Sequence, residues 1–562
     1  MSTDSRELSS SLEEENTTAI RSIDGQILKT LVEAGMTWLK TNQQTVNALN
    51  VFPVPDGDTG TNMLLTMQAA HHEIIDSHET NIGKMAHMVA QGALMGARGN
   101  SGVILSQLWR GFARALDSID TMDAALFNRA LDEARKTAYK GVVRPVEGTI
   151  LTVAKDISLA VEKALPLNSN LITLLELCVH AGEESVKHTP ELLPVLKQAG
   201  VVDSGGKGLL IIFEGMLRYF KGQPMETAIS TIQPISSIAM GEAMETVEPG
   251  QDYEVVVDFQ PRVELDLEDF YNTLSDMGTS IQVGEGDGLY RMHIHVPTEN
   301  LYLPINYTRE LGVVTKVAIE NLIAQMNDIA GKKVPELNLA QIEPGQIGVI
   351  AISPGDGISR IFASLGAAAI VKGGQTMNPS TEEILQAYEN LPTDKIIILP
   401  NNKNILMAAQ SSASLSVKKV AVIPSKNVPQ GLSAMLRLVP DGEFDQIVEE
   451  MINALNDVET GEITTATRSV EINDVEVHEG EVIALLNGTL VQSSNSLQEA
   501  CLGLLKKANT EEHERITLFY GANISKSETD SIIEQIRKVY PGHELEVHEG
   551  DQPHYQFIIA IE

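Results

Sequence analysis

From about residue 24 to residue 220 the chain carries a single periodicity, that of amphipathic helices. Leu28, Leu31, Val32 and Leu39 recur at the spacing that places them on one stripe of a helix. Short segments with Gly, Pro or Asn separate further helices, predicted over residues 64–76, 82–95, 103–116, 120–138, 148–164, 170–187 and 207–220. Strand-like alternation is missing from this sequence, so residues 17–228 are predicted to form an all-α domain.

The pattern changes after this region. Residues 229–250 have the Pro, Ser and Glu content of a linker, and residues 250–331 are predicted to form a small α+β domain. A second linker is expected over residues 332–345. From residue 346 to residue 562 apolar strands alternate with helices, with strands expected at 347–353, 367–371, 395–399, 418–423, 516–520 and 556–561. Such alternation predicts an α/β region that contains a parallel sheet, with polar loops after its strands such as residues 373–378.

Composition excludes several classes of protein. A net charge of −35 opposes binding to a phosphate backbone, so nucleic acid is not expected as a partner. Cys178 and Cys501 are the only cysteines, which is too few for a disulfide framework. No apolar run reaches the ~20 residues of a membrane helix. The first 16 residues are Ser/Glu-rich, predicted to be disordered, and lack a signal-peptide pattern, so a cytoplasmic protein without a transmembrane segment is expected.

Two carboxylates one residue apart mark the most informative turn of the chain. Asp56 and Asp58 lie in a stretch stiffened by prolines, and hydroxyl and amide side chains follow at once. Clustered carboxylates suit Mg²⁺. Gly57 and Gly60 leave room for backbone N–H groups to approach an anion. The stretch predicts a metal–nucleotide site; the alternative is a solvated Asp-Gly turn.

Three other helix starts can bind an anion. Residues 96–102 form a Gly-rich turn that contains Gly99, Asn100, Ser101 and Gly102 and leads into a helix. Unpaired N–H groups and the helix dipole favour a phosphate there, although Asn100 or Ser101 can equally be an ordinary N-cap. The turn lacks the Gly-Lys-Ser/Thr ending of a Walker loop. Similar polar starts are found at residues 201–208 and at Thr149.

His293 and His295 lie two residues apart in an alternating strand. Both side chains therefore point to the face opposite Met292 and Ile294. Two imidazoles on one face can bind Zn²⁺ if a third ligand converges on them. A solvent-facing pair of histidines is the alternative.

These motifs resemble a known family. Residues 56–62, Asp-Gly-Asp-Thr-Gly-Thr-Asn, together with the turn at 96–102, resemble the nucleotide-binding subunit of dihydroxyacetone kinases. The order of the regions resembles the catalytic subunit of bacterial fatty acid kinase. Further matching stretches cover residues 50–55, 373–381, 399–404 and the C-terminal segment from 520 to 553. The resemblance extends over nearly the whole chain.

The resemblance implies an ATP site inside a barrel of helices, with Mg²⁺ between carboxylates and phosphates. Asp56 and Asp58 match the metal ligands, Asn50 lies nearest the place of a third ligand, and Thr59 replaces a family histidine. Asp56, Asp58 and Thr59 are thus the expected catalytic residues. The turns and the matching together give the expected nucleotide contacts: Gly60, Thr61, Asn62, Gly99, Asn100, Ser101, Gly102, Thr149, Asp203 and Gly205.

The resemblance also implies partners and a second metal site. His293 and His295 match a family His-x-His pair taken as a zinc site, and Glu254 stands where the family has a Cys. The C-terminal region resembles the fatty-acid-binding DegV fold. A separate DegV-family protein that delivers the fatty acid is therefore implied, as is a homodimer formed through the middle domain.

The function expected from this resemblance is ATP-dependent phosphorylation of a fatty acid to an acyl phosphate. A fatty acid is already ionised near pH 7, because its pKa is about 4–5, and needs no general base. A kinase for a small hydroxy-ketone such as dihydroxyacetone is the first alternative. A non-enzymatic, nucleotide-sensing and lipid-binding scaffold is the second.

Overall fold

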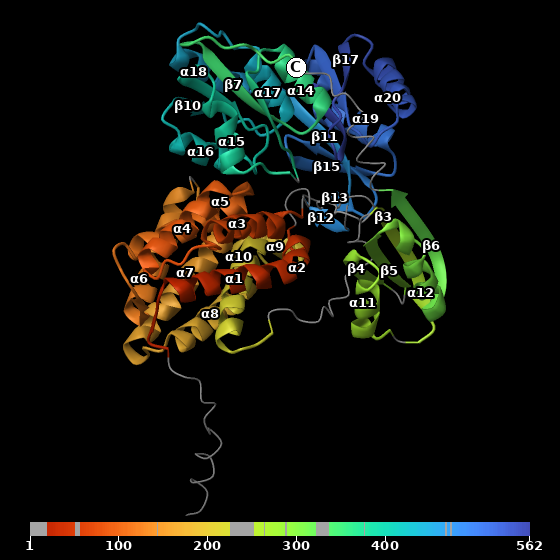
Figure 1. Cartoon of the computed structure of the whole chain (residues 1–562). Helices are drawn as coiled ribbons and strands as arrows, with labels where there is room; N and C mark the ends of the chain where they lie inside the picture. The colour runs from red at the N-terminus through yellow and green to blue at the C-terminus, as the bar shows by residue number, and fades with distance from the viewer. Residues whose placement is uncertain are drawn as a thin grey trace, which may run out of the picture. The chain divides into compact units, whose positions relative to one another are not determined.

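The computed structural model describes residues 20–50, 57–142, 144–224, 252–263, 265–286, 289–321, 337–375, 377–466, 469–472 and 475–562. The predicted disordered N-terminus, the linker at 229–250 and Asp56 lie outside the described residues. The chain divides into two compact units (Figure 1), one built from residues up to 225 and from 337 onward, the other from residues 226–336. The two units are described separately.

The N-terminal region of the first unit is helical, as predicted. Its helices are α1 (Gly25–Thr41), α2 (Gln43–Ala48), α3 (Thr59–Ile74), α4 (Ile82–Met95), α5 (Gly99–Ala115), α6 (Ala124–Gly141), α7 (Ile150–Ala164), α8 (Leu171–Leu192), α9 (Pro194–Ala199) and α10 (Ser204–Phe220). Two short strands, β1 (Ser22–Ile23) and β2 (Met122–Asp123), pair antiparallel. The predicted stripe of α1, which includes Leu28 and Leu39, is buried in one apolar core.

Three of these helices begin earlier than the apolar periodicity predicts. Helix α3 begins at Thr59 rather than 64, α5 at Gly99 rather than 103, and α10 at Ser204 rather than 207. Their first turns carry glycines and polar residues, which an amphipathic pattern does not register. The sequence motifs at 58–62, 99–102 and 203–206 therefore lie at helix N-termini.

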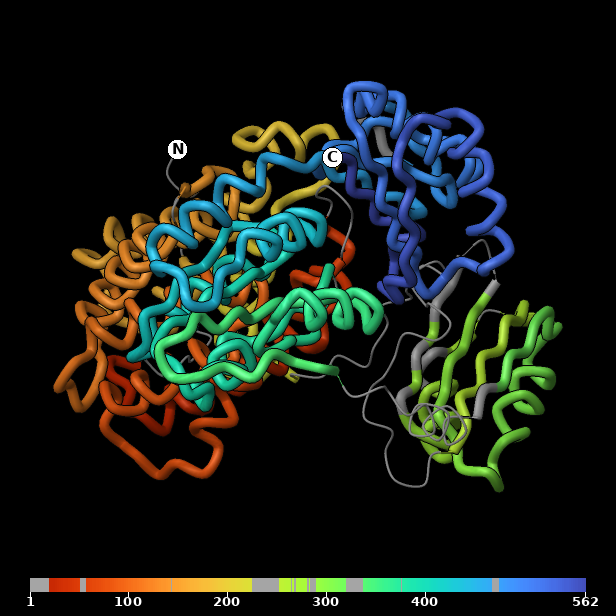
Figure 2. Tube along the Cα trace, turned by 90° about the horizontal axis from the view of Figure 1, so that it is seen from above, coloured from red at the N-terminus to blue at the C-terminus, as the bar shows by residue number. Residues whose placement is uncertain are grey.

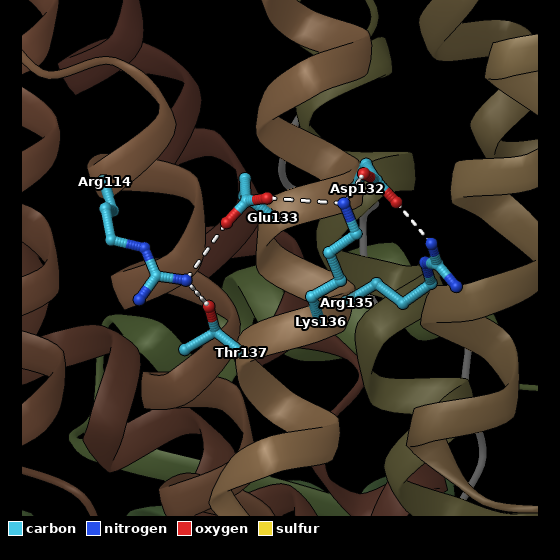
Figure 3. Close-up of polar contacts among 6 residues, drawn as sticks. All are labelled: Arg114, Asp132, Glu133, Arg135, Lys136 and Thr137. Carbon is cyan, nitrogen blue, oxygen red and sulfur yellow. Dashed lines mark hydrogen bonds and ion pairs between the residues drawn. The ribbon is translucent and has the colours of Figure 1, made fainter.

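Polar contacts on the surface hold α6 against α5 (Figure 3). One guanidinium nitrogen of Arg114 donates to Glu133 Oε2 at 3.1 Å and to Thr137 Oγ1 at 2.7 Å. Asp132 pairs with Arg135 and with Lys136 along α6 itself. Exposed ion pairs of this kind each stabilise a fold by roughly 1 kcal/mol at most. The apolar core beneath them therefore contributes most of the stability of this helix pair.

The interior of the helical region contains an apolar cavity of about 100 Å³. Its walls are aliphatic and aromatic, and include Leu28, Leu105, Trp109, Ile157 and Leu209. A polyphosphate in such a cavity would lose its hydration without gaining hydrogen bonds. The predicted nucleotide contacts lie instead at the helix N-termini.

The C-terminal region of the first unit is α/β and contains the predicted parallel sheet. Strands β7 (Ile347–Ser353), β8 (Ala369–Lys372), β9 (Lys395–Leu399) and β10 (Lys419–Val422) lie in the order β10-β9-β7-β8, all parallel. One face packs with α15 (Thr381–Glu389) and α16 (Leu406–Leu415). The other face packs with α14 (Asp356–Ser364), α17 (Val428–Met435) and α18 (Phe444–Ala454).

A six-stranded mixed sheet, ordered β15-β14-β11-β18-β16-β17, completes this region. Its strands are β11 (Glu459–Thr465), β14 (Val482–Leu486), β15 (Thr489–Ser494), β16 (Arg515–Tyr520), β17 (Glu544–Glu549) and β18 (Tyr555–Ile561). Helices α19 (Leu497–Lys507) and α20 (Lys526–Val539) pack on one face of this sheet. Strands β12 (Val470–Ile472) and β13 (Val475–Val477) form a separate hairpin.

The second unit, yellow-green in Figure 2, is a four-stranded antiparallel sheet with two helices. Its strands β3 (Tyr253–Pro261), β4 (Thr279–Gly286), β5 (Leu289–Val296) and β6 (Gly312–Asn321) lie in the order β4-β5-β3-β6. Helices α11 (Leu267–Ser275) and α12 (Leu303–Leu311) complete it, which confirms the predicted α+β class. Of the helices that the structure describes across both units, none is long and apolar enough to span a membrane.

Candidate phosphoryl-transfer site

Asp58 occupies the N-cap position of α3 but does not cap the helix. In α1 and α6 the N-cap residues Asp24 and Asp123 accept a hydrogen bond from a first-turn N–H group, as N-cap carboxylates usually do. The Asp58 carboxylate meets side-chain amides instead. Asn50 Nδ2 lies 3.5 Å from Oδ1, and Asn378 Nδ2 donates to Oδ2. The partners of the Asp58 carboxylate are thus side-chain amides from other segments rather than the first turn of its own helix.

Burial raises the pKa of Asp58 to about 6, although the amides of Asn62 and Asn378 lower it. Only 7% of the residue is exposed. A buried carboxylate without a cationic partner is costly, and a nearby metal ion favours its ionised form. The site thus suits a cation. Its expected fellow ligand, Asp56, lies just before the described part of this turn.

Three helix N-termini, those of α3, α5 and α10, meet around Asp58, and the start of α7 adjoins that of α10. Ser204 Oγ, at the start of α10, donates to Thr59 Oγ1 of α3 at 3.2 Å. Asn62 of α3 reaches the start of α5, where its Nδ2 atom lies 2.6 Å from the point at which Gly99 would carry a Cβ. The starts of α7 and α10 touch through Ile150 and Gly205. Helix N-termini present unpaired N–H groups and a positive dipole, so this arrangement can bind several phosphate oxygens.

Glycine is required at two of these positions for different reasons. Gly99 has a φ of +56°, a conformation that residues with a Cβ rarely adopt. Gly102 lies where α5 crosses α3, and a Cβ there would be 2.4 Å from Thr66 Oγ1. Gly99 thus shapes the turn, whereas Gly102 lets the two helices approach closely.

Some of the expected nucleotide contacts are turned toward other partners. Thr61 Oγ1 accepts hydrogen bonds from Gln43 at 2.9 Å and from Asn47 at 3.0 Å, both in α2. A Cβ on Gly60 would lie 2.4 Å from the carbonyl oxygen of Gln43. Thr149 caps α7 by accepting from Leu151 N. In this structure Thr61 bonds α2, Gly60 lets α3 approach α2 closely, and Thr149 caps α7.

The remaining expected contacts stay near the site. Asp203 caps α10, because its Oδ2 accepts from Gly206 N at 2.6 Å. Burial raises the pKa of Asp203 to about 6. Asn100 and Ser101 lie in the first turn of α5, where Asn100 Nδ2 is 3.5 Å from Asn404 Oδ1 of the α/β region.

The structure adds site residues that the sequence analysis did not assign. Asn378 binds Asp58, and Arg98, just before α5, donates to the Asn378 carbonyl oxygen at 2.9 Å. Ser204 contacts Thr59. The sequence marked residues 373–378 as a polar loop after a strand. No local signal indicated which helix that loop would meet.

In the second unit His293 and His295 are buried side by side on one face of β5, with ring centroids 5.0 Å apart. The solvent-facing alternative is therefore wrong. His293 Nδ1 lies 3.4 Å from Glu254 Oε1 on β3, and burial lowers the pKa of His293 to about 4. In the part of the chain that the structure describes, no three His, Cys, Asp or Glu residues are grouped to hold a metal. The predicted zinc site is not supported.

The fold and the site define a DAK2-domain protein. Residues 53–218 match the DAK2 domain family. Residues 248–329 match the middle domain, and residues 348–562 the C-terminal domain, of the FakA-like fatty acid kinase proteins. Together these matches cover the helical region, the α+β unit and the α/β region.

Full-length relatives agree with these matches. Protein YloV of Bacillus subtilis (strain 168) is 39% identical over 557 residues, which cover 97% of this chain and 100% of that protein. An uncharacterised protein of Staphylococcus aureus (strain USA300) is 38% identical over 97% of this chain and 100% of its own length. The chain belongs to the FakA-like fatty acid kinase family.

Solved structures resemble parts of the chain only distantly. Dihydroxyacetone kinase from C. freundii, in complex with AMP-PNP and Mg²⁺, has 17% identity and a TM-score of 0.28, over 37% of this chain and 36% of that one. DegV, a fatty acid binding protein from Bacillus subtilis, has 14% identity and a TM-score of 0.28, over 38% of this chain and 98% of that one. At these scores the likeness does not extend to function.

Proposed function

We propose that this protein transfers the γ-phosphoryl group of ATP to the carboxylate of a fatty acid. The products are an acyl phosphate and ADP, and a separate fatty-acid-binding protein of the DegV type presents the acid. Membership of the FakA-like fatty acid kinase family supports a kinase. The observation that carries the proposal is the buried Asp58 carboxylate among the N-termini of α3, α5 and α10.

The residues at the site fit Mg²⁺. Asp58 is a buried carboxylate, and Asn378 Oδ1 is a buried oxygen with no hydrogen-bond partner among the described residues. Asp58 and Asp56 would hold the ion, with Asn50 as a neutral third ligand. When bound, Mg²⁺ neutralises charge on the β- and γ-phosphates. Zn²⁺ has no role in this proposal.

The chain itself positions the reacting groups. N–H groups at the starts of α3, α5 and α10 would hold phosphate oxygens, with Asn62, Asn100 and Ser101 beside them. A carboxylate oxygen of the acid attacks the γ-phosphorus as the bond to the bridging oxygen breaks, and ADP leaves. The acid carries no proton near pH 7, so the site needs no general base.

The resemblance suggests the cellular setting. We propose that the acyl phosphate feeds phospholipid synthesis, that the protein acts in the cytoplasm, and that it forms a homodimer through its second unit. Sedimentation of the full chain tests the dimer directly, because a monomer at micromolar concentration would contradict it.

One incubation tests the reaction. The full chain is mixed with Mg-ATP, oleate and a DegV-family fatty-acid-binding protein, and ADP is measured together with hydroxylamine-trapped acyl phosphate. Both products should appear only when the acid and the binding protein are present. Turnover of dihydroxyacetone by the chain alone would favour the hydroxy-ketone kinase. ATP binding without turnover of any acceptor would favour the scaffold.

A further inference from the structure

The loop between β8 and α15 belongs to the α/β region but lies against the start of α5. Arg98 and Ser380 form a β-bridge, and Thr381 N donates to the Ala97 carbonyl oxygen at 3.1 Å. Two nitrogens of Arg98 pair with the two carboxylate oxygens of Glu383, at 3.0 and 3.1 Å. A bidentate pair of this kind fixes both distance and orientation.

Apolar packing supports the same contact. Ala97 and Val103 of the helical region are buried in one cluster with Ile350, Ile384 and Ala408 of the α/β region. The cluster covers the face of the parallel sheet that α15 and α16 flank. Because these side chains are buried together, the helical region and the α/β region share an apolar core at this contact.

The contact places Asn378 on the metal-binding carboxylate. Only 3% of Asn378 is exposed, and its Nδ2 donates to Asp58 Oδ2. Its backbone carbonyl accepts from Arg98 at 2.9 Å. The loop is fixed on its other side by a capping box, in which Ser380 and Glu383 bond each other's backbone N–H. Asn378 is thus held by both regions of the first unit.

One atom of Asn378 is left for a ligand. Its Oδ1 is buried, and the described residues give it no hydrogen-bond partner. A buried acceptor without a hydrogen-bond partner is destabilising. A cation, or a water molecule bound to a cation, would satisfy this oxygen.

We infer that Asn378 is a positioning residue of the phosphoryl-transfer site, so that the α/β region completes the site of the helical region. This inference rests on the proposed function. The amide of Asn378 holds Asp58 Oδ2 and fixes how the carboxylate faces the metal, while Oδ1 remains available to the ion or its water. Groups that orient metal ligands in this way commonly affect metal affinity by roughly 10- to 100-fold.

The test measures metal binding without turnover. Mn²⁺ replaces Mg²⁺, AMP-PNP replaces ATP, and bound Mn²⁺ is followed by electron paramagnetic resonance on the full chain. Asn378→Ala should weaken Mn²⁺ binding by about 10-fold or more. Glu383→Gln keeps the capping box, because Gln also serves at that position, but removes the charge that pairs with Arg98. It should weaken Mn²⁺ binding in the same direction and by less.

Glu382→Gln is the matched control, because Glu382 is the neighbouring exposed carboxylate and bonds only Gln386 among the contacts that the structure describes. It should leave Mn²⁺ binding unchanged. Wild-type Mn²⁺ affinity in Asn378→Ala, or tighter binding, would overturn the inference. If Asn378→Ala does not fold, wild-type affinity in Glu383→Gln would do so. No acyl acceptor is used, so a failed fatty acid kinase assay and a failed Mn²⁺ result are distinguishable.

Discussion

At the scale of single residues, Asp58 shows that an aspartate at a helix N-cap position need not cap the helix when its neighbours offer other hydrogen-bond donors. Asp24, Asp123 and Asp203 all cap helices through their carboxylates. Asp58 occupies the same position of α3, yet its oxygens face the amides of Asn50 and Asn378. A carboxylate released from capping and buried among neutral donors is poised to bind a cation.

Asp58→Asn should therefore abolish most of the kinase activity. The variant keeps the shape of the side chain but loses the charge that holds the metal. We expect kcat to fall by about 100-fold or more, measured as ADP release with oleate and its binding protein. Asp123→Asn is the matched control, since it makes the same change at an exposed helix cap. Full turnover in Asp58→Asn would show that the metal site lies elsewhere.

The buried carboxyl of Asp203 should make the stability of the protein depend on pH. Burial raises its pKa from the ordinary value of 3.8 to about 6 in the folded protein. Folding therefore favours the protonated carboxyl of Asp203. The stability that this protonated form contributes is fully present below about pH 4 and is lost as pH rises through about 6. Asp203→Asn avoids the loss and still caps α10. Its free energy of unfolding relative to wild type should rise over that range by up to about 3 kcal/mol.

Urea unfolding at several pH values between about 4 and 7 measures this difference. Asp203→Ala separates the cap from the charge. It should show the same rise with pH but be less stable than Asp203→Asn by about 1 kcal/mol at every pH. A difference between Asp203→Asn and wild type that does not vary with pH would refute the explanation.

At the scale of elements, apolar periodicity identified the middle of each helix or strand more accurately than its ends. Helix α4 and strand β9 have the bounds that the sequence predicts. The starts of α3, α5 and α10 were placed too late, because their first turns face the site and carry no apolar stripe. Strand β4 was not predicted, since Gly284 and Gly286 weaken its alternation. The residues omitted from the helices include the expected nucleotide contacts at their N-termini.

Gly99→Ala should damage the start of α5 more than backbone strain alone explains. A Cβ at a φ of +56° costs about 1 kcal/mol, and here it would also meet Asn62. Gly200→Ala is the matched control, because Gly200 has a φ of +66° and open space around it. Thermal unfolding should show a larger loss for Gly99→Ala, and AMP-PNP binding should weaken only in that variant. Equal losses in both would mean that Asn62 simply moves aside.

At the scale of the whole molecule, the sequence predicted the fold of each region but not which surfaces meet. The parallel sheet and its polar loops followed from strand spacing, and residues 373–378 were recognised as one such loop. The contact of Asn378 with Asp58 depends on packing between two regions, including Ala97 against α15. No local pattern in the sequence indicates which surfaces will meet. The part of the candidate site that comes from the α/β region was therefore not predictable.

The two cysteines can report whether the first unit unfolds as one body. Cys178 in α8 and Cys501 in α19 are fully buried. Burial raises the pKa of both thiols, to about 12 for Cys501. Neither should react with a thiol reagent in the native protein. In Cys178→Ala and Cys501→Ala, the remaining thiol should become reactive at the same urea concentration.

Glu383→Gln supplies the comparison for this measurement, because it removes the ion pair between the two regions. Both urea midpoints should then fall slightly and stay equal, because the shared apolar cluster still joins the two regions. Separate midpoints in the wild-type background would show that the helical and α/β regions unfold independently. Rapid labelling of either thiol without urea would contradict the burial itself.

The sequence separation of 320 between Asp58 and Asn378 also sets an order of events during synthesis. Translation adds residues from the N-terminus, and regions fold as they emerge from the ribosome. The helical region is complete long before residue 378 has been made. A nascent chain therefore holds the Asp58 carboxylate without the Asn378 amide. If this amide positions the metal ligand as we infer, full ATP consumption is expected only after the last third of the chain has been translated and has docked.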